Sequence, residues 1–264
     1  MKTLRGALFI RLQSGFSRRD LLAIVTLLCV IVGILLPATI SKTQSKAEIA
    51  KCLDNLKQYG AAHSTLFQDG AVRFEGWPRL WIRPFHAVDP TLKDTFCPAA
   101  PARPADSLVL SPEGGQVDRT WVVSGGQTTN QGSYGFNGFF YLDSPFVSGK
   151  ESFKSPAMVT DPSRTPVFAD SVWVDFWPNV NDLPARDLLT GDNYAKGGLS
   201  RIAIPRHAAR RSAAARDFDA SNTLPGAVNL VFVDNHAETV GLEKLWGFSW
   251  HRDWVNPPKR PGLP

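Results

Sequence analysis

The chain has 264 residues, of which 43% are hydrophobic and 20% charged, enough to bury a core in one or two domains. The formal net charge is +5, but removing Lys2, Arg5 and Arg11 from the first fifteen residues leaves +2. Net charge therefore gives little support to nucleic-acid binding. A basic cluster remains at 206–216, with few aromatic residues among its arginines, and we expect a solvated loop there rather than a phosphate-binding patch.

Residues 15–40 form the most informative segment of the chain. An apolar run from Leu21 to Leu36 follows Asp20, and a carboxylate beside hydrocarbon is costly unless it is paired. The length predicts a membrane-spanning helix, and the heavier positive charge before it places the N-terminus in the cytoplasm. The alternative is a secretory signal peptide, which predicts a mature N-terminus near residue 40.

The same segment resembles the N-terminal signal of type IV pilins and type II secretion pseudopilins. Gly15 matches the residue before the cleavage site, Phe16 the new N-terminus, and Asp20 the acidic position of the mature helix. Pro37 falls where such helices often kink. The chain departs from the pattern with Asp in place of Glu, and with Arg18 and Arg19 where apolar residues are usual.

This resemblance implies cleavage after Gly15 by a prepilin peptidase, methylation of Phe16, and assembly through the N-terminal helix. The implied partners are the peptidase, the membrane and other pilin-like subunits, with no nucleic acid. The implied location is the bacterial inner membrane, crossed once, with the globular part in the periplasm or at the cell surface. Such a protein is a structural subunit of a type II secretion or type IV pilus-like system and not an enzyme.

The predicted fold class is α+β, with a long N-terminal helix packed on a small antiparallel sheet with long loops, as in pilins. Apolar residues at helical spacing follow the membrane segment, so we expect one long or two collinear helices over 17–68. Candidate strands lie at 119–124, 134–142 and 166–177, and a hairpin at 227–240 turns at Asp234 and Asn235. Helical spacing returns at 242–254. The predicted segments are a leader at 1–15, a transmembrane and assembly helix at 16–40, an amphipathic helix at 41–69, a globular α+β part at 70–254 and a Pro-rich tail at 255–264.

The three cysteines fit an exported protein. Cys29 lies within the apolar run and is expected to serve in packing. Cys52 and Cys97 are a disulfide candidate that would close a loop of about 45 residues, worth about 3–4 kcal/mol; two buried thiols are the alternative. Without histidines at ligand spacing, a zinc site is not expected from these cysteines.

Further segments resemble a subgroup of pilin-like proteins from planctomycete- and verrucomicrobia-type bacteria. The matching stretches are CLDNLKQYG from Cys52, FCPAA at 96–100 and GSYGFNGFF at 132–140. The subgroup also carries a C-terminal processing-associated element, a His followed later by Asp-Gly. The residues that resemble this element are His207, Asp234, Asn235 and His236, with Asn235 replacing the glycine and a long insertion following His207.

No catalytic set stands out. His207, Asp234 and His236 suggest a metal or acid–base site, but a turn capped by Asp234 explains the pattern better. Acidic residues late in the globular part make Asp182, Asp187 and Asp192 weak calcium candidates by analogy with pseudopilins; no other cofactor is expected. The eight tryptophans suggest sugar stacking or simply core filling. The alternative function is a membrane-tethered exported enzyme or carbohydrate-binding module that uses a pilin-type anchor.

Overall fold

The computed structural model describes residues 18–68, 72–108, 111–146, 151–208 and 214–264, without the side chains of Asp20, Cys29, residues 32–44 and Tyr194. Gly15 and Phe16 therefore lie outside the described residues. The chain divides into two compact units, residues 1–44 and residues 45–264.

A single helix, α1 (Arg18–Gln68), contributes to both units. In the first unit, large apolar side chains from Leu21 to Ile31 are exposed by 41–67%. In the second unit, one side of the helix is buried, at Cys52, Leu56 and Tyr59, while Lys51 and Lys57 are exposed. The change from an apolar to a one-sided sequence along α1 therefore coincides with the start of the folded second unit.

The second unit is built on a five-stranded sheet in the order β5-β3-β4-β6-β7, with a separate hairpin of β1 and β2. The strands are β1 (Trp121–Gly125), β2 (Thr128–Gly132), β3 (Tyr134–Asn137), β4 (Pro166–Asp170), β5 (Asp175–Phe176), β6 (Ala227–Phe232) and β7 (Ala237–Gly241). The pairs β3–β4, β4–β6 and β6–β7 are antiparallel, whereas β3 and β5 are parallel.

The remaining helices are short. They are α2 (Ile82–Val88), η1 (Pro90–Asp94), η2 (Ala105–Ser107), η3 (Gly138–Phe140), η4 (Pro156–Met158), η5 (Pro162–Arg164), η6 (Asp192–Tyr194), η7 (Leu199–Arg201) and η9 (Leu242–Gly247), where η marks 3₁₀ turns. Helical spacing at 242–254 thus yields only the 3₁₀ segment η9, which ends at Gly247.

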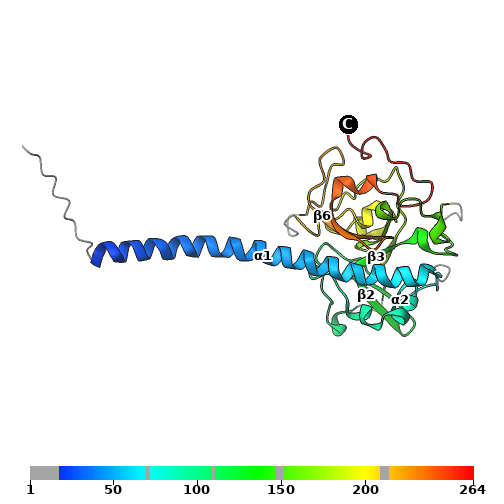
Figure 1. Ribbon diagram of the computed structural model, residues 1–264, viewed down its shortest axis with the longest axis horizontal. Coiled ribbons are helices and arrows are strands. Elements are labelled where there is room, and N and C mark those ends of the chain that lie inside the picture. The colour runs from blue at the N-terminus through cyan, green and yellow to red at the C-terminus, as the bar shows by residue number, and fades with distance from the viewer. Residues whose placement is uncertain (1–17, 69–71, 109–110, 147–150, 209–213) are drawn as a thin grey trace, which may run out of the picture. The chain divides into compact units, whose positions relative to one another are not determined.

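Both faces of the sheet are covered. One apolar cluster joins α1 and α2 to Phe136 and Phe168, and Figure 1 shows this part of α1 crossing the body of residues 45–264 near β3 and α2. The other cluster joins Ala169 and Leu230 to irregular segments and η9. Neighbouring residues of a strand point to opposite faces of the sheet, and both faces are covered. Every residue of β4 and β6 is therefore buried.

The predicted fold, a pilin-like arrangement on a small antiparallel sheet, was wrong. The structure has a mixed five-stranded sheet plus a two-stranded one, not the small antiparallel sheet of the pilin-like prediction. In the described part of the chain, no helix combines the length and apolarity needed to cross a bilayer.

The physical reason for the mixed sheet lies at 166–177, which was predicted as one strand. Ser171 interrupts it: its hydroxyl accepts a hydrogen bond from the Trp173 amide at 3.0 Å, and β5 then pairs with the far edge of β3. The sequence pattern does not reveal such a break, since residues 166–176 are buried on both sides of it and show no alternation.

Candidate functional site

Four metal-binding side chains from distant parts of the sequence meet inside the second unit. They are Cys52, Cys97, Asp170 and His207, and one ligand atom from each lies within 4.8 Å of the others. All four residues are buried, with exposed fractions of 4% or less.

The fold positions each residue separately. Cys52 is on the buried side of α1, and Asp170 ends β4, where it pairs with Tyr134 of β3. Cys97 follows η1, and its amide donates a hydrogen bond to the Ser133 hydroxyl at 2.7 Å. His207 exchanges two backbone hydrogen bonds of 2.8 Å with Ala227, which fixes it beside the start of β6.

The four side chains are linked to one another by polar contacts. The Cys97 Sγ lies 3.6 Å from His207 Nε2, which in turn lies 3.1 Å from Asp170 Oδ2. The Cys52 thiol donates a hydrogen bond to Asp170 Oδ1 at 3.6 Å and accepts one from the Tyr134 hydroxyl at 3.4 Å. The Asn229 amide donates to Asp170 Oδ2 at 2.8 Å.

Arg206 forms an ion pair with the carboxylate of Asp170. Its Nη1 lies 3.3 Å from Asp170 Oδ1, and the pair is fully buried. The remaining guanidinium donors reach backbone carbonyls of Gln116, Val117, Ser133 and Ser171. A buried charge requires this degree of pairing. Sequence analysis had placed Arg206 in a solvated basic loop; that was wrong for this residue. Arg210 and Arg211 lie outside the described residues.

The electrostatics follow from these contacts. Burial alone would raise the pKa of Asp170, but His207 and Arg206 outweigh it, and the pKa falls to about 2. Burial would likewise lower the pKa of His207, yet the Asp170 charge raises it to about 9. Burial raises the pKa of Cys52. Burial would also raise the pKa of Cys97, but hydrogen bonds with Cys52 and His207 help to outweigh it, and that pKa falls to about 7. The site thus favours a charged carboxylate.

Cys52 and Cys97 are free cysteines in the structure, not the disulfide that was one of the two predicted outcomes. Two thiols, one imidazole and one carboxylate are donors that bind divalent transition metals. Sequence analysis missed this combination because His207 is 110 residues from Cys97 and Asp170 is 118 residues from Cys52. The one available signal was a carboxylate ending the otherwise apolar strand PVFAD.

The residues of the C-terminal element do not meet at one site. His207 contacts Asp170 and Cys97, whereas Asp234 contacts His236, with Oδ1 and Nδ1 2.6 Å apart. Asp234 also accepts a hydrogen bond from the His236 amide at 3.1 Å, and Asn235 has φ = 67° in the turn between β6 and β7. Asp234 therefore caps its own turn, as the simpler explanation predicts.

The three calcium candidates accept hydrogen bonds from backbone amides. Asp182 accepts hydrogen bonds from the amides of Asn179 and Leu199, Asp187 from that of Leu189, and Asp192 from that of Asp187. Asp192 also forms an ion pair with Lys196 at 2.8 Å. Within the described ranges, the cluster of at least three metal-binding side chains is the one around Asp170, and these aspartates do not belong to it.

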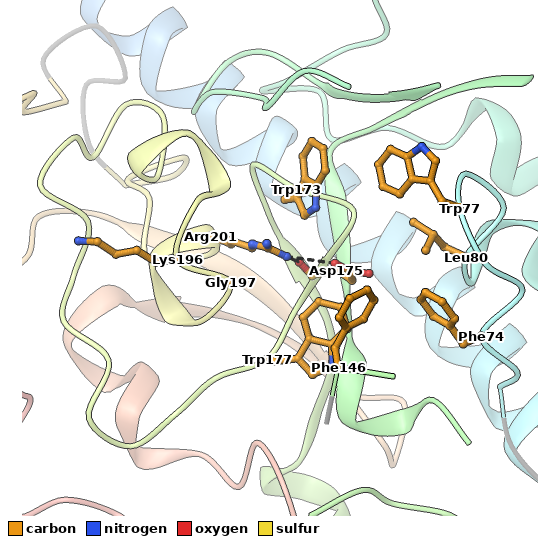
Figure 2. A pocket seen from close by; sticks show the side chains of 10 residues that line it. All are labelled: Phe74, Trp77, Leu80, Phe146, Trp173, Asp175, Trp177, Lys196, Gly197 and Arg201. Atoms are coloured by element: carbon orange, nitrogen blue, oxygen red, sulfur yellow. Dashed lines mark hydrogen bonds and ion pairs between the residues drawn. The ribbon is translucent and has the colours of Figure 1, made fainter. Parts of the chain in front are cut away.

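An aromatic cavity of about 350 Å³ opens elsewhere on the same unit (Figure 2). Trp77 and Trp173 stack there with ring centroids 6.0 Å apart, and Phe146 packs edge-on against Trp177 at 5.4 Å. Arg201 lies over the rings of Trp173 and Trp177 and pairs with Asp175 at 3.1 Å. Trp77 and Phe146 are exposed by 47% and 66%.

This cavity combines flat apolar rings with one ion pair, the composition that binds a ligand with an apolar face and a polar edge. Burial raises the pKa of Asp175 to about 7, although Arg201 opposes the shift. Trp173 is also buried and fills the protein interior as well as lining the cavity, whereas Trp77 is exposed.

Comparisons with family models, with curated proteins and with solved structures find no match to this chain.

Proposed function

We propose that the protein is an exported structural subunit that is cut after Gly15 by a prepilin peptidase and assembles with similar subunits through the first part of α1. The observation that supports this most is the set of eight exposed apolar side chains between Leu21 and Ile31. Burying one such side chain fully is worth about 1.5–3 kcal/mol, so the exposed helix requires an apolar partner.

Two kinds of partner satisfy this need in succession. Before cleavage, the apolar run from Leu21 to Leu36, which includes residues 32–36 whose side chains are not described, holds the precursor in the bacterial inner membrane with the N-terminus in the cytoplasm. After cleavage, the same side chains pack against the helices of neighbouring subunits. The exposed positions Leu21, Leu22, Leu27 and Val30 lie on all sides of the helix rather than along one stripe, which suits contact with several neighbours.

Asp20 sets the register of this packing. A carboxylate among apolar helices is unfavourable unless it is paired, and the new amino group of Phe16 on an adjacent subunit supplies the opposite charge. Arg18 and Arg19 precede Asp20 directly and compete for it within the same chain.

The test is the Asp20→Ala variant, with Asp20→Glu as the control that keeps the charge. We expect Asp20→Ala to be cleaved normally but to lose cross-linking to a second, differently tagged copy, because the pairing charge is gone. Asp20→Glu should retain both properties. Equal cross-linking of Asp20→Ala and the unmodified protein would contradict the proposed register.

A further inference from the structure

We propose that Cys52, Cys97, Asp170 and His207 bind one Zn²⁺ ion in a closed tetrahedral site. This inference concerns the folded second unit and does not depend on how the N-terminal helix is processed or assembled. Each of the four ligands comes from a different segment: α1, the loop after η1, the end of β4, and the residue bridged to Ala227.

The distances between donor atoms fit a zinc ion at the centre. Zn–S bonds of about 2.3 Å and Zn–N or Zn–O bonds of about 2.0–2.1 Å place S and N, or S and O, about 3.5 Å apart in a tetrahedron, and N and O about 3.3 Å apart. With Asp170 Oδ2 as the coordinating oxygen, the observed separations are 3.6 Å for Cys97 Sγ to His207 Nε2, 3.9 Å for Cys52 Sγ to Asp170 Oδ2, and 3.1 Å for His207 Nε2 to Asp170 Oδ2. Only small movements are needed to coordinate the ion.

The charges balance when zinc is present. Two thiolates and the Asp170 carboxylate carry three negative charges, and Zn²⁺ with Arg206 carries three positive ones. Because Asp170 and Arg206 have side chains with 0% exposure, an unbalanced charge here would be costly. Binding releases to the solvent the protons that the two thiols and the imidazolium carry beforehand, so that two thiolates and a neutral imidazole coordinate the ion, the imidazole through Nε2.

The surroundings orient the ligands as metal sites require. Arg206 holds Asp170 Oδ1, and the Asn229 amide donates to Oδ2, so the carboxylate has a fixed direction. The Ser133 hydroxyl, through the Cys97 amide, fixes the backbone of the second thiol. Such outer contacts commonly account for tenfold to hundredfold changes in metal affinity.

The donor set selects the metal and its role. Thiolates and imidazole favour zinc over calcium or magnesium, which prefer oxygen ligands. Four protein ligands complete the tetrahedron, which is typical of a structural site rather than a catalytic one. A surface cavity of about 320 Å³, lined in part by Cys97, Asn55 and Phe96, offers an entry route.

The experiment measures zinc in the full chain, purified in detergent with a reductant, supplied with Zn²⁺ and then desalted. We expect about one zinc per chain by elemental mass spectrometry, since the four ligands form one site. Replacing zinc with Co²⁺ should give the absorption bands of tetrahedral thiolate-bound cobalt. This second measurement uses the unmodified chain and so does not depend on any variant folding.

Two histidine variants provide the matched comparison. His207→Gln should lower zinc affinity at least tenfold. His236→Gln should leave the zinc content unchanged, because His236 forms an exposed pair with Asp234 outside the cluster. Zinc loss in both variants, or in neither, would contradict the assignment.

Two results with the unmodified chain would overturn the proposal. One is a chain without zinc whose mass is lower by two hydrogens and whose peptide map joins Cys52 to Cys97, which identifies a disulfide between them. The other is a chain without zinc or cobalt bands whose two buried thiols are free.

Discussion

His63 lies on the buried side of α1 among aromatic rings. It stacks on Phe67 with ring centroids 5.0 Å apart and meets the edge of Phe140 at 4.8 Å. Its exposed fraction is 1%, and its Nε2 has no hydrogen-bond partner among the described residues. Burial lowers the pKa of His63 to about 3, so the folded protein keeps this imidazole neutral where the unfolded chain protonates it.

Lowering the pH therefore destabilises the fold through His63. As pH falls below about 6.5, the unfolded chain binds a proton that the folded chain does not, and the loss reaches about 2 kcal/mol by pH 5. The His63→Phe variant should lose this contribution, so its stability should fall less between pH 7 and pH 5. Urea unfolding of both proteins at the two pH values measures the difference and cancels contributions from other groups.

His236→Gln is the control, because His236 is exposed by 41% at its side chain. It should keep the acid sensitivity of the unmodified protein. An identical loss of stability in His63→Phe and the unmodified protein would show that His63 does not carry the effect.

At the scale of single residues, sequence analysis singled out three of the four cluster members but did not bring them together. Cys52 and Cys97 were paired as a disulfide candidate or free thiols, and His207 was associated with Asp234. Asp170 was not singled out. Spacing along the chain carries no information about a site whose members meet only after the sheet has formed.

At the scale of elements, α1 packs closely against the hairpin of β6 and β7 at Gly60. A Cβ atom at this position would lie 2.1 Å from Asn235 Oδ1 and 2.8 Å from Val231 Cγ2. Glycine is required here by the close approach and not by its helix propensity, which is poor.

Gly60→Val should therefore destabilise the protein strongly. Overpacking costs about 1–3 kcal/mol, and Asn235 must also leave its place in the turn. Ala61→Val is the matched control, since it introduces the same β-branched side chain at the next, exposed position of α1. Thermal unfolding should show a large loss for Gly60→Val and a small one for Ala61→Val; equal losses would place the close contact elsewhere.

Local patterns predicted individual elements better than their arrangement. The hairpin at 227–240 was visible from its strands and from the Asp-Asn turn. β1 begins two residues after the start of the segment predicted at 119–124 and ends one residue after its end. The parallel pairing of β3 and β5 was not visible, because it depends on the break at Ser171. Nor did the sequence show that both faces of the sheet are covered, since buried strands lack the alternation that identifies a solvent-facing side.

At the scale of the whole molecule, the proposed function and the proposed zinc site concern different units. The first unit presents exposed apolar side chains on α1, and the second encloses a charged cluster within a covered sheet. A structural zinc ion would join four segments of the second unit and stabilise it independently of assembly. Failure of either proposal leaves the other intact.

The central claim is that the chain is processed and assembled as a pilin-like subunit, and N-terminal mass spectrometry of the protein from its native membranes tests it most directly. The account predicts a first residue at Phe16 carrying an N-methyl group. A chain that begins at Met1, or near Lys42 after signal-peptide cleavage, would contradict it.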